Sequence, residues 1–240
     1  MLAEVSVAFE FWLLVLGAYL LGSVPAAYLV ARWSQGIDIR QYGSGNVGAG
    51  NIWRSASKPL ALLVGFFDLG KGVVMVWAAQ LLGLDVAQQV AVGVAAIIGH
   101  NWPIFLRFSG GRGILTYLGI IFILTPKLAV IALAIALLAA PFRQLSLGVF
   151  IALVITPIFS WFLSQPLAVE ERLPITLAYL AALLIALLRR LTAPPTSLTA
   201  SVSTGQLIVN RLLFDRDIRD RDAWIHRQPL EESPAKEGKD

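Results

Sequence analysis

The chain has 240 residues, of which 57% are hydrophobic and only 14% are charged, and its mean hydropathy is +0.73. Because soluble domains carry about 25% charged residues, this composition excludes a soluble domain and indicates an integral membrane protein. The formal net charge of +4 is too small to indicate a nucleic-acid-binding protein, and the lack of cysteine excludes disulfides and thiolate metal sites.

Seven apolar segments follow one another along the chain, and a helix needs roughly 20 residues to cross the bilayer core. The residues before them carry no basic region, so we expect the first segment to be retained rather than cleaved as a signal peptide. Pro25 predicts a kink in the first segment, and residues 125–127 predict a turn before the fifth. The expected segments are 11–33, 59–84, 86–99, 114–124, 128–140, 145–163 and 174–188.

Basic residues are divided unequally between the loops at the two ends of these segments. One end holds Arg32, Arg40, Arg54, Lys58, Arg107, Arg112, Arg143, Arg189 and Arg190, whereas the other holds Lys127 and Arg172. The positive-inside rule therefore predicts an external N-terminus and a cytoplasmic C-terminus. The expected fold class is an all-α integral membrane protein with about seven transmembrane helices.

The composition changes at residue 194, where a Pro-Pro-Thr-Ser linker follows the last apolar segment. We therefore expect a polytopic membrane domain over residues 1–193 and a cytoplasmic extension over residues 194–240. Opposite charges alternate along residues 215–222, which is typical of a solvated segment with surface ion pairs. From about residue 231 the composition predicts disorder.

A glycine-rich polar island at residues 42–54 separates the first two apolar segments. Its glycines allow positive φ and a backbone amide nest for an anion. Ser44, Asn46 and Asn51 add polar groups, and Arg54 adds a guanidinium fork suited to phosphate or carboxylate. The alternative is a flexible turn at the membrane surface, although a turn requires neither these amides nor the arginine.

A second island at residues 107–113 has the same character and precedes the apolar segment 114–124. Amides at a helix start carry partial positive charge and bind phosphate. Two such islands on one face indicate a phosphorylated substrate. The Gly-x-x-x-x-Gly-Lys-Ser/Thr spacing of a nucleotide P-loop is absent from the sequence.

Three ionisable residues lie within or beside apolar segments. Asp68 and Lys71 share a helix face, and they form either a structural ion pair or a pair in which Lys71 faces substrate anions. His100 either caps a helix end, donates to a substrate or acts as a catalytic base, although a lone histidine is more often structural. The histidines and carboxylates show no metal-ligand spacing, so no metal is expected.

The first island, Gly-Ser-Gly-Asn-Val-Gly-Ala-Gly-Asn-Ile-Trp-Arg at 43–54, resembles the first motif of the bacterial acyl-phosphate-dependent glycerol-3-phosphate acyltransferases, the PlsY family. Residues 21–25, 36–40, 67–72, 99–105 and 110–113 are similar to that family in the same order. The resemblance implies transfer of a fatty acyl group from acyl phosphate to the 1-hydroxyl of glycerol 3-phosphate. The products would be lysophosphatidic acid and phosphate, in the first step of bacterial phospholipid synthesis.

The resemblance also implies a site at the cytoplasmic face of a multi-pass protein in the bacterial cell membrane, with no cofactor. The expected partners are glycerol 3-phosphate, acyl phosphate and the lipid bilayer, and no oligomeric state is indicated. The catalytic candidates are Ser44, Asn46, Arg54, Lys71 and His100. The phosphate-binding candidates are Gly45, Gly48, Asn51, Gly110, Gly111, Arg112, Gly113 and Thr116.

The sequence departs from the family pattern in three of its motif features. Gly50 replaces a threonine, and the lysine of the second motif is absent, with Ser109 and Arg112 in that loop. In the third motif, Gly205 and Ile208 occupy the positions of a histidine and an asparagine. Either other residues of the C-terminal extension replace this histidine and asparagine by folding back over the site, or catalysis is weak or absent. The candidate substitutes are Asn210, Arg211 and Arg216.

An acyl phosphate is already activated, so positioning and charge stabilisation can carry the reaction without a strong protein base. In the usual account of the family, a substrate phosphate takes the proton of the hydroxyl. The alternative function is a non-catalytic or transport protein that binds an organophosphate through the same loops. Two observations argue against a transport protein. Both islands are expected at one face, and the sequence has no pair of interrupted apolar segments at corresponding positions of two halves.

Overall fold

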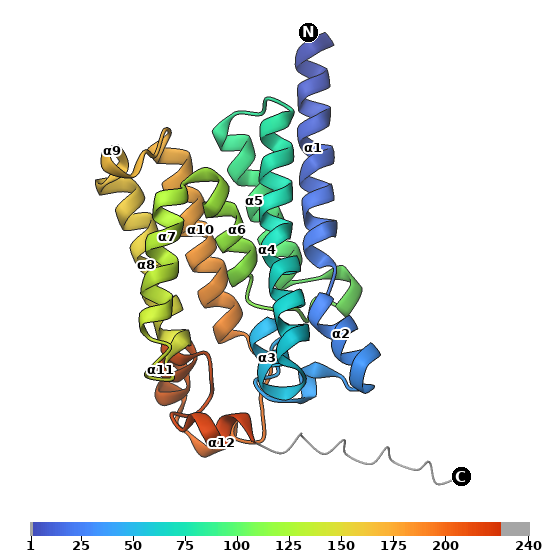
Figure 1. Cartoon of the computed structure of the whole chain (residues 1–240), viewed down its shortest axis with the longest axis vertical. Coiled ribbons are helices and arrows are strands. Elements are labelled where there is room, and N and C mark those ends of the chain that lie inside the picture. Colours follow the sequence, from blue (N-terminus) through green and yellow to red (C-terminus); the bar gives the residue numbers. More distant parts are fainter. Residues whose placement is uncertain (1, 227–240) are drawn as a thin grey trace.

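The computed structural model describes residues 2–226, with side chains from residue 7, and the regular elements of this part are all helical (Figure 1). The elements up to residue 193 are α1 (Leu2–Ser23), α2 (Ala26–Gln35), η1 (Ile39–Gln41), α3 (Ala49–Ser55), α4 (Lys58–Leu81), α5 (Val86–Asn101), η2 (Ile104–Leu106), α6 (Ile114–Leu124), α7 (Pro126–Leu138), α8 (Leu145–Phe162), α9 (Ser164–Leu167) and α10 (Arg172–Leu191). After them come η3 (Thr199–Ser201), α11 (Thr204–Phe214) and α12 (Arg221–Ile225). The tail expected to be disordered from about residue 231 lies outside the described residues.

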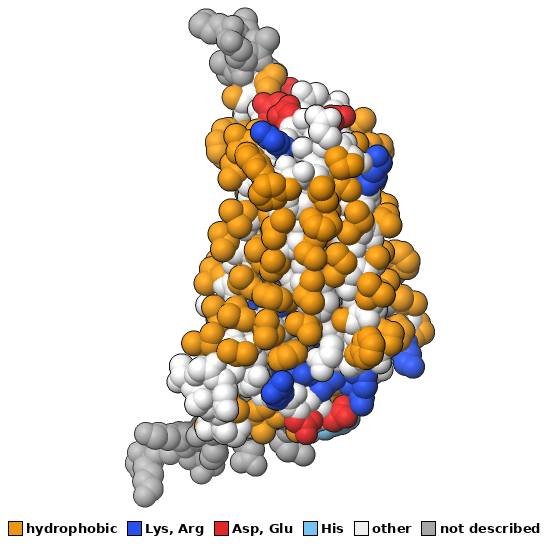
Figure 2. Space-filling view, turned by 90° about the vertical axis from the view of Figure 1, so that its left-hand side faces the viewer, with side chains coloured by type: hydrophobic (Ala, Val, Ile, Leu, Met, Phe, Trp, Pro, Cys, Tyr) orange, Lys and Arg blue, Asp and Glu red, His pale blue; other side chains and the backbone are white. Residues whose placement is uncertain are grey.

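Five stretches of the described chain are long and apolar enough to cross a membrane. They are Val7–Gln35, Lys58–Leu81, Val86–Leu106, Leu145–Phe162 and Arg172–Leu191. The apolar helices α6 and α7 have 11 and 13 residues, which is about 17 and 20 Å at 1.5 Å per residue and short of a bilayer core. The structure therefore confirms the all-helical membrane fold, with five candidate spans and two shorter helices. Figure 2 shows a band of hydrophobic side chains between two charged ends.

The first apolar segment is divided into two helices rather than one kinked helix. Helix α1 ends at Ser23 and α2 begins at Ala26. Pro25 has no N–H to continue the helical hydrogen bonds and disfavours helical geometry at Val24. The carbonyls of Gly22 and Val24 at this break accept hydrogen bonds from Lys71 Nζ at 3.2 and 2.7 Å. A membrane-embedded lysine therefore satisfies the backbone of a broken helix.

Glycines bring the long helices into close contact. A Cβ built on Gly99 of α5 would lie 2.2 Å from the carbonyl oxygen of Tyr19 in α1. Gly119 of α6 would likewise place a Cβ 2.2 Å from the carbonyl oxygen of Leu69 in α4. Small residues allow such backbone approach where hydrophobic burial does not drive helices together in lipid. These contacts hold α5 against α1 and α6 against α4, and the second island lies between α5 and α6.

The charged C-terminal segment is packed against the bundle, at the same end as α2 and α3 (Figure 1). The expectation of a solvated segment over residues 215–222 is wrong at two positions, because Arg216 and Asp217 are only 6% and 1% exposed. Hydrogen bonds to the chain that follows α10 explain this burial: Arg211, Thr196 and Thr199 all donate to the Asp217 carboxylate. The charges therefore dock the segment rather than solvate it.

Candidate active site

The first island is held in shape by the side chain of Asn51, which is fully buried in α3. Its Nδ2 donates to the carbonyls of Ile39 and Tyr42 at 3.1 and 2.9 Å, and its Oδ1 accepts from the Ser44 amide at 2.9 Å. With its amide engaged in this way, Asn51 organises the loop from within. It lines neither of the two cavities described below.

Ser44 and Arg54 meet at the open side of the loop. Arg54 Nη2 donates to Ser44 Oγ at 3.2 Å, and the Asn46 amide donates to the same oxygen at 3.4 Å. Desolvation by the surrounding walls, together with repulsion from Arg221, lowers the pKa of Arg54 from its ordinary value. Asn46 contributes a buried Oδ1 that has no hydrogen-bond partner among the described residues. The structure thus brings together three of the candidates, Ser44, Asn46 and Arg54.

The glycines of the first island serve mainly to shape it. Gly45 adopts a φ of +70° and its amide donates to the carbonyl of Tyr42 at 2.9 Å. Gly48 caps α3, and its carbonyl accepts from the amide of Asn51. The amides of Ser44, Gly45 and Asn46 all donate within the loop, so these three amides hold the loop in shape.

The second island packs directly against the end of α5. The amides of Gly110 and Gly111 donate to the carbonyls of Asn101 and His100 at 3.2 and 3.0 Å. A Cβ on Gly111 would lie 2.1 Å from His100 Nε2, so no larger residue fits there without a rearrangement. Gly113 follows with a φ of +71° and begins α6. This packing carries Arg112 into the smaller cavity, where its Nε donates to Asp215 Oδ1 at 2.8 Å.

The candidates Lys71 and His100 form a separate buried cluster with Asp68. Lys71 Nζ lies 2.9 Å from Asp68 Oδ1, in addition to its bonds to the broken helix, and His100 Nδ1 lies 3.5 Å from the same oxygen. These residues border a small void of about 10 Å³ and neither of the two larger cavities. Of the two interpretations of Lys71, this geometry favours the structural ion pair. Thr116 is likewise fully buried and donates to the carbonyl of Asp68 at 3.0 Å.

The C-terminal candidates divide into two groups. Asn210 Nδ2 donates to the carbonyl of Asp217 at 3.0 Å, and Arg211 Nε donates to its carboxylate at 2.7 Å, so both residues bind the segment together. Although burial opposes it, hydrogen bonds from Arg211, Thr199 and Thr196 lower the pKa of Asp217 below its ordinary value. Gly205 and Ile208 are exposed and line neither cavity.

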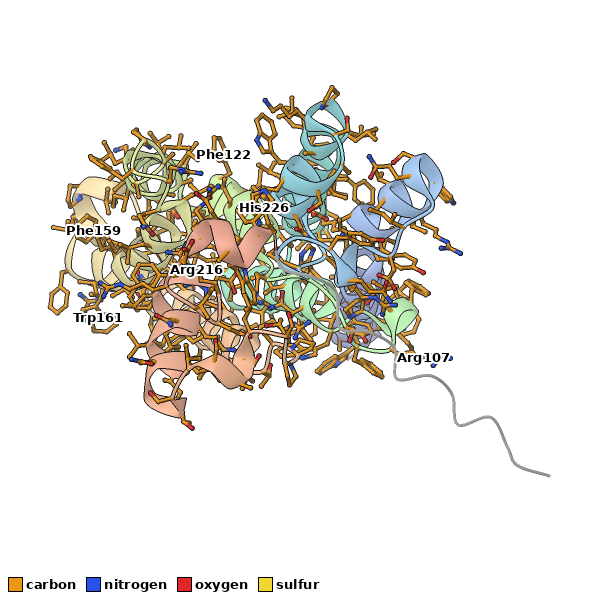
Figure 3. All side chains as sticks on the ribbon, turned by 90° about the horizontal axis from the view of Figure 1, so that it is seen from below. Arg107, Phe122, Phe159, Trp161, Arg216 and His226 are labelled. Carbon is orange, nitrogen blue, oxygen red and sulfur yellow. The ribbon has the colours of Figure 1, made fainter. Side chains whose placement is uncertain are left out.

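Arg216 differs from Asn210 and Arg211 because it lines both larger cavities. Its Nη2 donates to Gln144 Oε1 at 3.4 Å and its guanidinium lies 5.0 Å from the Phe214 ring centre. Its buried Nε has no hydrogen-bond partner among the described residues. Figure 3 shows Arg216 beside the C-terminal helices, whereas Arg107 lies at the outer edge of the molecule. Arg216 is therefore the C-terminal candidate placed to meet a ligand.

Two adjoining cavities open at this end of the bundle. The smaller, of about 90 Å³, is rich in charged residues and is lined by both islands, the end of α10 and the C-terminal segment. Its arginines are Arg40, Arg112, Arg189, Arg190, Arg211 and Arg216, and its acids are Asp215 and Asp217. The larger, of about 600 Å³, is lined by Ser44, Asn46 and Arg54 among its polar residues. Its apolar walls include Trp53, Leu62, Phe66, Leu69 and Leu115.

Several charged lining residues were not predicted as site residues from the sequence, and three of them are Arg189, Arg190 and Asp215. Arg189 and Arg190 were interpreted only as the basic end of the last segment, yet both are buried and have an Nε without a partner among the described residues. Asp215 lines both cavities and was interpreted as part of a solvated charge run. The sequence signal that could have identified Arg189 and Arg190 was the pair of adjacent arginines at the end of an apolar segment. That signal is ambiguous, because the same pattern indicates the orientation of a helix in the membrane.

Together, the fold and these cavities define a multi-pass helical membrane protein whose arginine-lined pocket adjoins an apolar groove at one end. Comparison with known proteins gives the family. Residues 12–193 match the family model described as Glycerol-3-phosphate acyltransferase. Glycerol-3-phosphate acyltransferase 4 of Dehalococcoides mccartyi strain CBDB1 is 44% identical over 217 residues, which cover 90% of this chain and 94% of the relative. Glycerol-3-phosphate acyltransferase 5 of another strain is 45% identical over 226 residues, which cover 93% and 97%.

A crystal structure of PlsY (YgiH), an integral membrane glycerol 3-phosphate acyltransferase, in its glycerol 3-phosphate form matches with a TM-score of 0.68. The match has 30% sequence identity and covers 75% of this chain and 88% of that one. The lysophosphatidic acid form of the same protein matches with a TM-score of 0.65. The present chain belongs to the glycerol-3-phosphate acyltransferase family of the PlsY type.

Proposed function

We propose that this acyltransferase moves a fatty acyl group from acyl phosphate to the 1-hydroxyl of glycerol 3-phosphate, giving lysophosphatidic acid and phosphate. The observation that carries the proposal is the position of Ser44, which lines both the arginine-lined cavity and the apolar groove and is held by Arg54. A reaction between a small phosphorylated acceptor and an acyl chain needs such a junction. The crystallised relative is titled with both glycerol 3-phosphate and lysophosphatidic acid.

In the proposed arrangement, the acyl chain lies along the walls formed by Leu62, Phe66 and Leu115, and the charged headgroups lie at the arginine end. Ser44 and Arg54 hold the glycerol phosphate, while Arg112 and Arg216 hold a phosphate in or beside the smaller cavity. Guanidinium forks suit these groups because they bind phosphate oxygens in pairs. Asn51, Lys71, His100 and Thr116 then keep the loops and helices in place without contacting the substrates.

The chemical step in this proposal is a substitution at the carbonyl carbon of the acyl phosphate. The 1-hydroxyl oxygen forms a bond to that carbon, the bond from the carbon to the phosphate oxygen breaks, and the hydroxyl proton passes to a phosphate oxygen. His100 is packed against Gly111 and Asp68 and borders neither larger cavity, which supports proton transfer to the substrate. The arginines stabilise the charge of the departing phosphate.

We further propose that the site faces the cytoplasm of a bacterial cell and that α6 and α7 complete a seven-segment membrane domain over residues 1–193. Support comes from the clustering of arginines around the two cavities, because the positive-inside rule favours the cytoplasm for such an end. The opposite end carries Lys127 and Arg172, with Glu170 and Glu171 beside them in the chain.

The test is an acyl-transfer assay on the purified protein with glycerol 3-phosphate and three donors: acyl phosphate, acyl-CoA and acyl carrier protein. We expect lysophosphatidic acid with acyl phosphate and far less product with the other two donors. Binding of glycerol 3-phosphate by folded protein without transfer from any donor would contradict the proposal and support an organophosphate-binding or transport protein.

A further inference from the structure

Asp215 connects the second island to the C-terminal segment. Its Oδ1 lies 2.8 Å from Arg112 Nε, and the two side chains are only 17% and 10% exposed. The residues are 103 positions apart in the chain. Among the hydrogen bonds of the described residues, this is the one that the Arg112 side chain makes. The bond uses Nε, which leaves both terminal nitrogens of the guanidinium for a ligand in the smaller cavity.

The backbone places this carboxylate. Asp215 is the C-cap of α11, with φ +53° and ψ +45°, and its amide donates to the carbonyl of Arg211 at 3.1 Å. Aspartate, asparagine and glycine tolerate this left-handed geometry better than other residues. Two residues later, Asp217 is anchored by Arg211. The Asp215 carboxylate is therefore presented to Arg112 by a turn that is fixed on both sides.

An arginine at position 112 needs such a partner more than a lysine would. The ammonium group of lysine is a compact charge with freely rotating donors, whereas the guanidinium is a planar fork whose donors must be aimed. A carboxylate bonded to Nε fixes that plane. The other acid that lines the smaller cavity is Asp217. Its carboxylate accepts hydrogen bonds from Arg211, Thr196 and Thr199, so Asp215 is the cavity carboxylate that pairs with Arg112.

We propose that Asp215 is a positioning residue that orients Arg112 for the phosphate group of a substrate. The proposal rests on the proposed function above. It deepens that function by making the docked C-terminal segment part of phosphate binding without requiring Asp215 to touch the substrate. The phosphate belongs either to glycerol 3-phosphate or to the acyl phosphate, and the kinetics of the two substrates distinguish these sources.

The test is a double-mutant cycle on the full-length enzyme, with KM and kcat measured separately for each substrate. Asp215→Asn keeps both the shape of the side chain and its tolerance of the left-handed backbone. We expect this variant to raise KM for one substrate about tenfold, a coupling of about 1.4 kcal/mol, with a smaller change in kcat. Asp215→Glu should restore part of the loss. In an Arg112→Lys background, the same Asp215→Asn change should alter that KM less than about twofold, because the ammonium needs no orientation.

Asp222→Asn is the matched control, since it also removes an ion-paired carboxylate from this segment, at a 56% exposed position that lines neither cavity. Its kinetics should match those of the wild type. A lowered KM in Asp215→Asn would overturn the proposal by showing that the carboxylate competes with substrate phosphate. Equal effects of Asp215→Asn in the two backgrounds would also overturn it, because Asp215 would then act independently of Arg112.

A binding measurement separates this proposal from the proposed function. Inorganic phosphate should raise the Tm of the wild-type protein, because a ligand that binds the folded state stabilises it. Asp215→Asn should need about tenfold more phosphate for the same rise in Tm, which matches the tenfold rise in KM expected for this variant. If Asp215→Asn needs more phosphate than the wild type but the wild type shows no acyl transfer, the proposed function fails and the positioning role stands. If both proteins respond equally to phosphate, the positioning role fails.

Discussion

Arg54 lies at the C-terminal end of the first island, where its Nη2 donates a hydrogen bond to Ser44 Oγ. We predict that Arg54→Ala raises KM for glycerol 3-phosphate, on the order of a hundredfold, because a charge-assisted bond to a phosphate contributes about 1.5–3 kcal/mol. Arg54→Lys should recover little of this loss, since an ammonium cannot form the same two-pronged contact. Steady-state kinetics with the acceptor varied provides the measurement, and unchanged KM in both variants would remove Arg54 from the site.

Asp217 should determine how tightly the C-terminal segment is docked. Replacing it by asparagine leaves Arg211 buried without its ion partner, a change that typically destabilises by about 3–5 kcal/mol. Hydrogen exchange of residues 204–226, compared between wild type and Asp217→Asn, measures this effect. Asp222→Asn, which alters an exposed pair, should exchange like the wild type. Equal protection in all three proteins would contradict the prediction.

The same carboxylate gives docking a pH dependence with a defined sign. The folded-state pKa of Asp217 lies below the ordinary value of 3.8, so the folded state binds fewer protons there than the unfolded state. Its contribution is therefore fully present above about pH 4–5 and is lost as the pH falls through the folded pKa. Wild-type protection should fall on acidification below about pH 4, and Asp217→Asn should lack that part of the change.

Sequence reasoning identified Ser44, Asn46 and Arg54 together because glycine-rich polar residues between apolar segments form a local signal. It did not separate the groups that line the cavities from those that support the loop. Asn51 has the same side-chain chemistry as Asn46, yet it bonds the carbonyls of Ile39 and Tyr42. Whether an asparagine lines the cavity or supports the loop depends on the orientation of α3 relative to the loop. Asp215 could not be found at all, because its pairing with Arg112 depends on a tertiary contact.

Helix α4 forms one wall of the apolar groove, where Gly65 lies opposite Leu115 of α6. A Cβ at Gly65 would lie 3.5 Å from Leu115, which is an ordinary contact. We predict that Gly65→Ala keeps activity, whereas Gly65→Leu fills part of the groove and shifts the preferred donor to a shorter acyl chain. Kinetics with acyl phosphates of decreasing length measure the shift. Gly70→Leu is the control, because this glycine has open space around it and lines neither cavity; identical chain-length profiles for the two leucine variants would contradict the prediction.

At the scale of elements, the apolar segments predicted the long helices, and the bounds of α4, α5, α6, α7, α8 and α10 agree within a few residues. Helix α1 is the exception, because it begins at Leu2 rather than at the expected residue 11. The ends of α4, α5 and α8 follow from polar or turn-forming residues beside long apolar runs. The break at Pro25 was predicted only as a kink, because the pattern does not show that Lys71 satisfies the freed carbonyls. The helices α11 and α12 were not predicted from the sequence, and the folding of the C-terminal extension over the site was one of two alternatives left open. The alternating charges of residues 215–222 did not decide between them, because they are typical of solvated chains as well as of docked ones.

At the scale of the whole molecule, the proposed orientation can be measured with single cysteines, since the chain has none of its own. We expect cysteines at Ser109 and Gly205 to be labelled from the cytoplasm of intact cells or inverted vesicles. Cysteines at Lys127 and Glu170 should be labelled from outside. Labelling of Ser109 and Gly205 from opposite sides would be incompatible with the structure, which joins the two regions through Arg112 and Asp215.

The smaller cavity has walls from the first island, the second island, the end of α10 and the turn after α11. During synthesis these parts leave the ribosome at very different times, since chains emerge from the N-terminus onward. A nascent chain that has inserted every long apolar helix still lacks Asp215, Arg216 and Asp217. The cavity therefore forms only after residues 215–217 have been synthesised, and a product terminated before them would embed in the bilayer without it.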